Sequence, residues 1–319
     1  MNNGVASARR RTMQLGMIGL GKMGGNMARR LSAAGMRIVG YNRHTDATAS
    51  LNREIGLVVA DSVADLVSKL EAPRRVWLML PAGDATETTV LELLDLLDPG
   101  DLIVDGANSW FKDSIRRAAL AKEEGIGFVD AGVSGGIWGL ENGYCLMVGG
   151  DDEAFAMIEP AVRRLAPGED RGFIHTGPAG SGHFVKMIHN GIEYGMMQAY
   201  AEGFALMKGR EDFGLDLAGI AETWRHGSVV RSWLLDLSAS VLDKDQELDA
   251  VEPFVADSGE GRWTALEGIE QGIPTPVMSL ALMARFASQG QQDYSSRLLA
   301  MMRNQFGGHP IRSAGESDH

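Results

Sequence analysis

A glycine-rich turn near the start of the chain constrains its fold more than any other feature. The turn joins a short apolar run, residues 14–18, to an amphipathic segment, residues 23–34. Glycines spaced as G-x-G-x-x-G allow a tight turn and a close approach of the backbone to a pyrophosphate, and the N-terminus of the following helix favours negative charge. The sequence therefore predicts that a dinucleotide contacts the turn, at Gly19, Leu20, Gly21, Lys22, Met23 and Gly24.

The periodicity of apolar residues changes once along the chain. Up to residue 178, short apolar runs alternate with amphipathic segments, which predicts βαβ units on a parallel sheet. From residue 179 to about Arg303 the periodicity is helical. We therefore predict an α/β Rossmann-type dinucleotide-binding domain over residues 13–178, followed by an all-α substrate and oligomerisation domain over residues 179–319. The basic, polar residues 1–12 are expected to form a disordered extension.

The pattern of apolar residues in the first half of the chain is specific enough to predict individual strands and helices. Strands are expected at residues 14–18, 37–41, 75–80, 102–104, 127–129, 145–148 and 173–175. Helices are expected at residues 23–34, 62–70, 85–97, 114–124 and 153–165.

Composition narrows the classes of partner. The net charge of −12 argues against binding to nucleic acid or to an anionic membrane surface. No run reaches the roughly 18 apolar residues that a membrane span requires, so we expect a cytoplasmic protein. The single cysteine, Cys145, excludes an intramolecular disulfide and a cysteine-based zinc site, and its apolar neighbours predict an inert, buried thiol.

The end of the second predicted strand should select the cofactor. Enzymes that use NAD usually carry an acidic residue there to bind the ribose hydroxyls. This chain has Asn42, Arg43 and His44, which we predict to contact the cofactor, and no acid before Asp46. A guanidinium can pair with a 2′-phosphate, so we favour NADP over NAD. The alternative is that Arg43 lies on a solvated loop.

Three more segments follow predicted strands, where ligands bind in open α/β sheets. Leu80 and Pro81 are expected to contact the cofactor, and the Asn108 amide is expected to reach both cofactor and substrate. A flexible turn follows a later strand and offers one hydroxyl and several backbone N–H groups, which suits a carboxylate or hydroxyl. Its residues are Ser134, Gly135 and Gly136. A nucleophilic serine lacks a matching base, and a purely structural turn is the other alternative.

Four polar residues share one face of a helix predicted from about Ala179 to Lys208. Lys186, His189, Asn190 and Glu193 are spaced i, i+3, i+4 and i+7. The remaining faces are apolar, and a buried lysine or glutamate requires a partner or a task. We therefore expect this helix to line a cleft.

Several motifs together resemble one family, the decarboxylating 6-phosphogluconate dehydrogenases. They are the glycine turn, Gly-Val-Ser-Gly-Gly, Gly-His-Phe-Val-Lys-Met-Ile-His-Asn-Gly-Ile-Glu-Tyr-Gly and Gly-Arg-Trp-Thr. The resemblance extends from Met13 to about His309, and the chain length resembles that of the short-chain form. Short forms often use NAD, which conflicts with the preference inferred from Arg43.

The resemblance implies a site. Lys186 matches the base that takes the C3 hydroxyl proton. Glu193 matches the acid that protonates C1 of the enediol that remains after the loss of CO2. His189 and Asn190 match residues that position the substrate. Residues matching the sugar-phosphate site are Tyr194, Arg262, Thr264, Arg285, Arg303 and His309.

The chain departs from the family's usual residues at two positions, and the resemblance also implies an oligomer. Arg262 stands where lysine is usual, and Pro81 where lysine often follows the strand. The tail that bears Arg303 and His309 commonly reaches a neighbouring subunit, which implies a homodimer or homotetramer. No metal is expected, because a third ligand beside His189 and Glu193 is not evident.

Two other functions compete. A β-hydroxyacid dehydrogenase of the 3-hydroxyisobutyrate type shares the two-domain plan but would not decarboxylate its substrate, nor need the C1 acid or the phosphate site. A catalytically silent NAD(P)-binding sensor would have no reason to keep Lys186 and Glu193 on one helix face.

Overall fold

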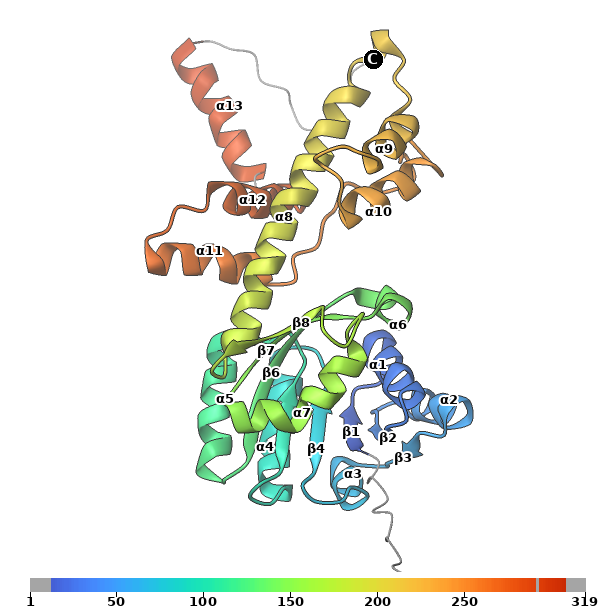
Figure 1. Cartoon of the computed structure of the whole chain (residues 1–319). Coiled ribbons are helices and arrows are strands. Elements are labelled where there is room, and N and C mark those ends of the chain that lie inside the picture. The colour runs from blue at the N-terminus through green and yellow to red at the C-terminus, as the bar shows by residue number, and fades with distance from the viewer. Residues whose placement is uncertain (1–12, 291–292, 308–319) are drawn as a thin grey trace, which may run out of the picture. The chain divides into compact units, whose positions relative to one another are not determined.

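The computed structural model describes residues 13–290 and 293–307, and the chain forms two compact units that divide between Ile188 and His189. The first unit is an eight-stranded sheet with helices on both faces, and the second consists of helices (Figure 1). The predicted α/β domain followed by an all-α domain is confirmed. The extension expected at residues 1–12 lies outside the described residues.

The sheet has the order β3-β2-β1-β4-β5-β6-β7-β8. The strands are β1 (Gln14–Ile18), β2 (Arg37–Tyr41), β3 (Val58–Val59), β4 (Arg75–Leu78), β5 (Leu102–Asp105), β6 (Gly127–Ser134), β7 (Cys145–Gly150) and β8 (Phe173–Gly177). Strand β1 pairs with β2 on one side and with β4 on the other. The direction in which the chain winds across the sheet therefore reverses between β1 and β4. Ligands bind at the carboxyl ends of strands at such a reversal.

One pair of strands departs from the predicted parallel sheet, because β6 and β7 are antiparallel. Residues 135–144 join them through a short 3₁₀ turn, Gly136–Trp138, and the four-residue helix α6 (Gly139–Asn142). A connection this short does not contain the long crossover that a parallel pair requires. The pairing places Cys145 directly opposite Ser134.

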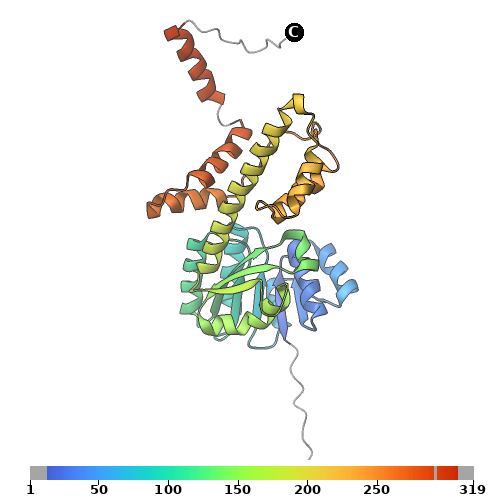
Figure 2. The same ribbon diagram turned by 45° about the horizontal axis from the view of Figure 1, so that its top comes forward.

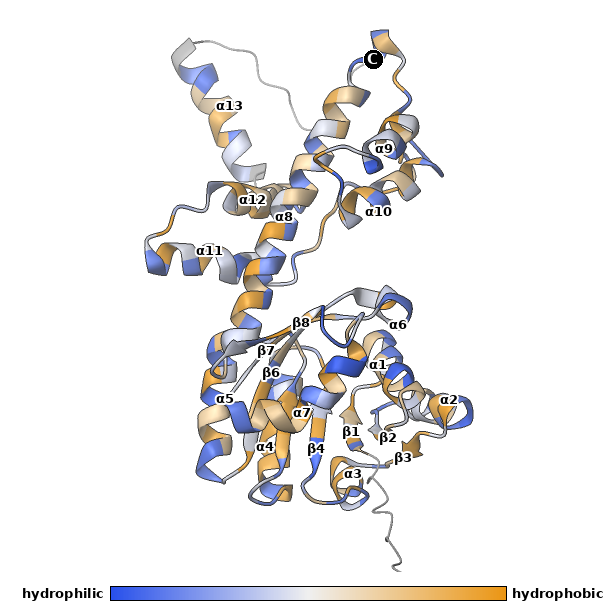
Figure 3. Ribbon diagram, in the orientation of Figure 1, coloured by the Kyte–Doolittle hydropathy of each residue, from blue (hydrophilic) through white to orange (hydrophobic). Residues whose placement is uncertain are grey.

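Alternate residues of the central strands supply two hydrophobic cores, one on each face of the sheet. Leu102 and Val104 pack with α1 and α7 on one face, while Ile103 packs with α3, α4 and α5 on the other. Figure 3 shows hydrophobic residues concentrated along these strands. The helices are α1 (Lys22–Ala33), α2 (Thr45–Ile55), α3 (Val63–Ser68), α4 (Asp84–Leu96), α5 (Phe111–Glu123) and α7 (Asp152–Leu165).

The second unit is built along a long helix, α8 (Ser181–Lys208), whose first residues belong to the first unit. Figure 2 shows α8 as one unbroken helix. Within the second unit, Tyr200 and Phe204 of α8 pack against α9 (Leu217–Arg225) and α10 (Trp233–Leu242). Tyr194 packs against α12 (Pro276–Ser288) next to α11 (Glu260–Gln271).

The remaining elements are a 3₁₀ turn, Glu211–Phe213, and α13 (Asp293–Gly307). Within the described residues, every element after β8 is helical. None of the helices formed by these residues is long and apolar enough to span a membrane.

Candidate functional site

The glycine turn has the geometry that a dinucleotide requires. Gly19 has a φ of 91°, and a Cβ there would lie 2.4 Å from the Met79 carbonyl oxygen. A Cβ at Gly24 would lie 2.0 Å from the Gly19 carbonyl oxygen, so α1 packs directly on the turn. At Gly21, by contrast, a Cβ would meet nothing within 4 Å. The turn is therefore closed on its inner side and open where a pyrophosphate would approach the N-terminus of α1.

Ligand sites usually have volumes of about 300–1,000 Å³, and the cavity above this turn has a volume of about 940 Å³. Its lining includes most of the predicted cofactor residues: Gly19, Gly21, Lys22, Met23, Gly24, Asn42, Arg43, His44, Leu80, Pro81 and Asn108. Other lining residues were not predicted: Val63, Met79, Asp84, Ala85, Thr88, Thr89, Glu92, Gly106 and Ala107. Those from α4 could have been found from their position just after a predicted strand. Since the lining fits a dinucleotide, the residues of this cavity are candidates to hold NAD(P).

Asn42 stabilises the glycine turn from the neighbouring strand. Its Oδ1 accepts a hydrogen bond from the Leu20 N–H at 2.9 Å, and its Nδ2 donates to the His44 carbonyl oxygen at 2.9 Å. The Asn42 amide therefore joins the first and second βα turns. Arg43, the next residue, is exposed and lines the same cavity.

Asn108 links this cavity to the turn that contains Ser134. It has a left-handed backbone with a φ of 51°, which asparagine tolerates better than most residues. Its Oδ1 accepts a hydrogen bond from the Val133 N–H at 3.1 Å. Gly106 lies close over Trp77, because a Cβ there would be 2.3 Å from the indole Nε1. The loop after β5 thus contacts both β4, through Gly106, and β6, through Asn108.

The Ser134 turn lies at the end of β6. Gly135 and Gly136 have φ values of 130° and 53°, which glycine adopts without strain. The opposing Cys145 is exposed, so the prediction that its thiol is buried is wrong. The side chains of a strand alternate between faces, and the buried Tyr144 and Leu146 flank Cys145 on the opposite side. Partial desolvation raises the pKa of the Cys145 thiol, and the nearby Lys186 opposes that rise.

Lys186 is held against β6 by the first turn of α8. Its side chain is 6% exposed, and a Cβ at Gly132 would lie 2.4 Å from the Lys186 Cβ. The carboxylate of Asp130, also on β6, accepts the N–H groups of Gly180 at 2.6 Å and His183 at 2.7 Å. Asp130 therefore caps the start of α8 and fixes the height of Lys186 above the sheet.

In the second unit, α8 carries four more of the predicted residues: His189, Asn190, Glu193 and Tyr194. The His189 Nδ1 lies 3.0 Å from the Asn190 Oδ1 and 4.0 Å from a Glu193 carboxylate oxygen. The Asn190 Nδ2 donates to Glu260 at 3.0 Å. The Glu193 side chain is 41% exposed within this chain, so the burial expected of both charged groups is found for Lys186 alone.

The predicted phosphate residues of the second unit surround Tyr194. The Arg285 guanidinium stacks on the Tyr194 ring, 3.3 Å from its centroid, and the Tyr194 hydroxyl lies 3.1 Å from the Ser258 hydroxyl. Arg262 forms a short ion pair with Asp257. Burial tends to raise the pKa of the Asp257 carboxyl, but the Arg262 hydrogen bond and neighbouring donors lower it overall.

Thr264 completes this group from α11. It is buried, its hydroxyl donates to the Glu260 carbonyl oxygen at 2.9 Å, and its side chain packs against Gly191 of α8. Asp257 and Glu260, which hold Arg262 and Asn190, were not predicted. Their signal was the acid-rich segment just before Arg262.

Two predicted residues are not brought into this group. Arg303 is exposed on α13, and His309 lies outside the described residues. Within the described part of the chain, no set of three or more His, Cys, Asp or Glu side chains is arranged to hold a metal ion.

Comparison with known families covers nearly the whole chain. The profile described as the NAD binding domain of 6-phosphogluconate dehydrogenase matches residues 14–177. The profile described as the 6-phosphogluconate dehydrogenase C-terminal domain matches residues 182–315.

Individual relatives agree with these profiles. The chain is 44% identical over 301 residues to an NAD(+)-dependent, decarboxylating 6-phosphogluconate dehydrogenase of Haloferax volcanii, covering 94% of this chain and 98% of that protein. The solved 6-phosphogluconate dehydrogenase of Plasmodium falciparum superposes with a TM-score of 0.81 at 31% identity, covering 96% of this chain and 67% of that one. The different coverage of the two relatives agrees with the expected short form.

The fold is also shared with the rival class. The solved 3-hydroxyisobutyrate dehydrogenase of Mycobacterium tuberculosis superposes with a TM-score of 0.69 at 24% identity, covering 88% of this chain and 94% of that one. Similarity at this level of identity shows a common fold and does not carry the activity over.

Proposed function

The chain belongs to the 6-phosphogluconate dehydrogenase family, and from this premise we propose that it converts 6-phospho-D-gluconate into D-ribulose 5-phosphate and CO2 while reducing NAD(P). The observation that carries the proposal is helix α8, on which the buried Lys186 and the partly exposed Glu193 lie seven residues apart. Residues spaced i and i+7 share one helix face.

Lys186 is the proposed base of the first step. The residues that line the cavity above the glycine turn would hold NAD(P), which would supply the acceptor for the hydride at C3 of the substrate. The neutral ε-amine of Lys186 takes the proton of the C3 hydroxyl, which leaves a 3-keto acid. The low exposure of Lys186 supports this role, because burial favours the neutral amine. When the C1–C2 bond breaks and CO2 departs, the Lys186 ammonium returns its proton to the carbonyl oxygen and an enediol forms.

Glu193 is the proposed acid of the last step. A protonated Glu193 delivers its proton to C1 of the enediol, which was C2 of the substrate. The neutral amine of Lys186 takes the proton of the C2 hydroxyl, and that carbon becomes the ketone of ribulose 5-phosphate. His189 and Asn190, within one turn on the same helix, are the proposed groups that orient the substrate. Asn108, Ser134, Gly135 and Gly136 are proposed to bind its hydroxyls and carboxylate.

The phosphate of the substrate requires cations in a chain of net charge −12. We assign it to the group around Tyr194, where Arg285 stacks on the Tyr194 ring, Arg262 stacks on the Phe286 ring and Thr264 offers a hydroxyl. Arg303 and His309 of the C-terminal segment are proposed to add to this group from a neighbouring subunit.

Substrate choice tests the proposal against the rival dehydrogenase. We expect measurable turnover of 6-phosphogluconate and a kcat/KM for 3-hydroxyisobutyrate lower by orders of magnitude, because the small acid cannot engage the arginines. A higher kcat/KM for 3-hydroxyisobutyrate would replace this function with the rival one. Cofactor binding without turnover of either acid would instead indicate a silent sensor.

We also propose that NADP is the preferred cofactor. Arg43 lines the cofactor cavity at the end of β2, where a guanidinium can form charge-assisted hydrogen bonds to a 2′-phosphate. The Haloferax volcanii relative is named as an NAD(+)-dependent enzyme. A direct test of Arg43 therefore decides between the two cofactors for this chain.

Arg43→Ala is expected to weaken NADP binding by roughly ten- to a hundredfold and to change NAD binding little. The measurement is kcat/KM for both cofactors in the native enzyme and the variant. Arg53→Ala, at the exposed far end of α2, removes the same charge away from the cavity and is the control. A native preference for NAD that survives Arg43→Ala would mean that Arg43 is a solvated loop residue.

A homo-oligomer, a dimer or a tetramer, is the proposed assembly. In the second unit, large apolar side chains such as Leu206, Ile269 and Leu280 are more than 60% exposed. Two apolar cavities of about 320 and 470 Å³ lie beside α8 in this unit. Apolar surface of this extent is typical of a subunit interface. Light scattering should give a multiple of the chain mass, and a monomer would contradict the proposal. The cytoplasmic location stays a prediction, which cell fractionation would test.

A further inference from the structure

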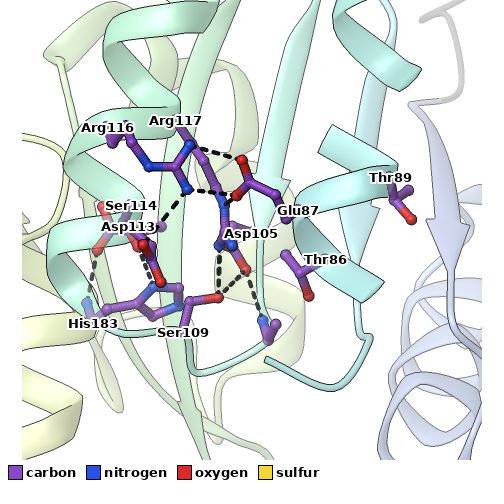
Figure 4. A network of polar contacts seen from close by, with 12 residues as sticks. Thr86, Glu87, Thr89, Asp105, Ser109, Asp113, Ser114, Arg116, Arg117 and His183 are labelled. Atoms are coloured by element: carbon purple, nitrogen blue, oxygen red, sulfur yellow. Dashed lines mark hydrogen bonds and ion pairs between the residues drawn. The ribbon is translucent and has the colours of Figure 1, made fainter. Parts of the chain in front are cut away.

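A buried network of charged and hydroxyl groups lies beneath the loop that carries Asn108 (Figure 4). Its centre is Arg117 of α5, which is 1% exposed. The Arg117 Nη1 donates to an Asp105 carboxylate oxygen at 2.9 Å and to the Ser109 hydroxyl oxygen at 3.0 Å. Its Nε donates to Glu87 of α4 at 2.8 Å. One guanidinium therefore connects α4, α5 and both ends of the loop after β5.

The loop closes on the same carboxylate. The Ser109 hydroxyl donates to Asp105 at 3.0 Å, and the Ala107 N–H donates to the other Asp105 oxygen at 3.0 Å. Asp105 is the last residue of β5 and is fully buried. With Asp105 and Ser109 both bound to Arg117, the residues between them have little freedom. Asn108 is thus constrained to its left-handed backbone at the cofactor cavity.

The mechanism proposed above uses Asn108 but leaves this network without a role. We propose that Arg117 is a positioning residue, which acts on the reaction by fixing the Asn108 loop relative to the cofactor cavity and the Ser134 turn. This inference rests on the proposed function for its catalytic readout. A charge buried to this extent is costly unless paired, so a network whose groups satisfy one another provides a rigid support.

The chain supplies a matched control in the neighbouring residue. Arg116 also binds Glu87, with contacts at 2.7 and 2.6 Å, but its side chain is about half exposed, and the residues that it contacts, Glu87 and Asp113, lie outside the loop. The paired arginines hold the pKa of Glu87 at about 2, chiefly through the Arg116 hydrogen bond. Arg116→Lys and Arg117→Lys thus make the same change at the same carboxylate, and only the second disturbs the loop.

A double-mutant cycle tests the inference. Arg117→Lys keeps the positive charge but loses the planar guanidinium group, whose N–H groups reach three partners. We expect it to lower kcat/KM for 6-phosphogluconate by roughly ten- to a hundredfold, the scale of a misplaced contact in an active site. In an Asn108→Ala background the same substitution should have little further effect, because the positioned group is gone. Arg116→Lys should leave kcat/KM near native in both backgrounds.

Additive losses in the cycle would overturn the inference, as would a lowered melting temperature with unchanged kcat/KM. Should Arg117→Lys fail to fold, Ser109→Ala serves instead, because it removes the bridging hydroxyl while the buried ion pair stays. Its loss of activity should likewise disappear in the Asn108→Ala background, and persistence there would overturn the inference.

Hydrogen exchange separates this inference from the proposed function, since it requires no substrate. A peptide spanning residues 105–110 should exchange faster in Arg117→Lys than in Arg116→Lys or the native protein. If native protein does not turn over 6-phosphogluconate, the proposed function fails, and faster exchange still supports the control of the loop by Arg117. Equal exchange in all three proteins would overturn it.

Discussion

Lys186→Met is expected to lower turnover of 6-phosphogluconate by roughly 10²–10⁴-fold or more, because positioned proton transfer is worth about that much. Methionine fills a similar volume against Gly132, so the start of α8 should stay in place. Cofactor affinity should be near native, since Lys186 is not among the residues that line the cofactor cavity. Steady-state kinetics and a cofactor titration measure the two effects.

Lys208→Met provides the matched control for this substitution. Lys208 is at the other end of α8, about half exposed, and pairs with Glu247. Its loss should leave kcat close to the native value, because exposed ion pairs contribute little. Near-native turnover in Lys186→Met would refute the assignment of the base.

Glu193→Gln should lower release of ribulose 5-phosphate by roughly 10²–10⁴-fold, since glutamine keeps the shape and hydrogen bonding of glutamate but has no proton to deliver. Oxidation and loss of CO2 precede this step, so a first turnover that reduces cofactor should persist. Rapid-quench analysis of reduced cofactor and released ketose separates the steps.

Glu202→Gln, on an exposed part of the same helix, is the control for Glu193→Gln. It should release product at the native rate. If Glu193→Gln also does so, the acid that protonates C1 is another group.

The parts of the fold that local sequence determines were predictable. The glycine turn, the strands that flank it and the face of α8 follow from spacing alone, and the structure contains each of them. Helix α2 and strand β3 were missed, because β3 has two residues and α2 is rich in polar and small residues. The direction of β7 depends on the length of the segment that connects it to β6, rather than on the composition of the strand.

Candidate site residues were predictable where the residue type carries its own chemistry, as with Lys186 and Arg43, whose roles stay proposals. Supporting residues were not, because they act through contacts between distant segments. Asp130 reaches His183 across 53 positions of the chain, and Glu260 reaches Asn190 across 70. The exposure of Cys145 depends on which face of β7 it occupies, and the apolar run around it carries no alternation that reveals the face.

The central claim is that one protein couples oxidation of a sugar acid to decarboxylation. The most direct measurement supplies 6-phosphogluconate labelled with ¹³C at C1, together with NADP or NAD, and follows reduced cofactor and labelled CO2 in the same reaction. The expected result is that both appear in equal amounts, with ribulose 5-phosphate as the other product. Reduced cofactor without labelled CO2, and with a 3-keto acid as the stable product, would contradict it.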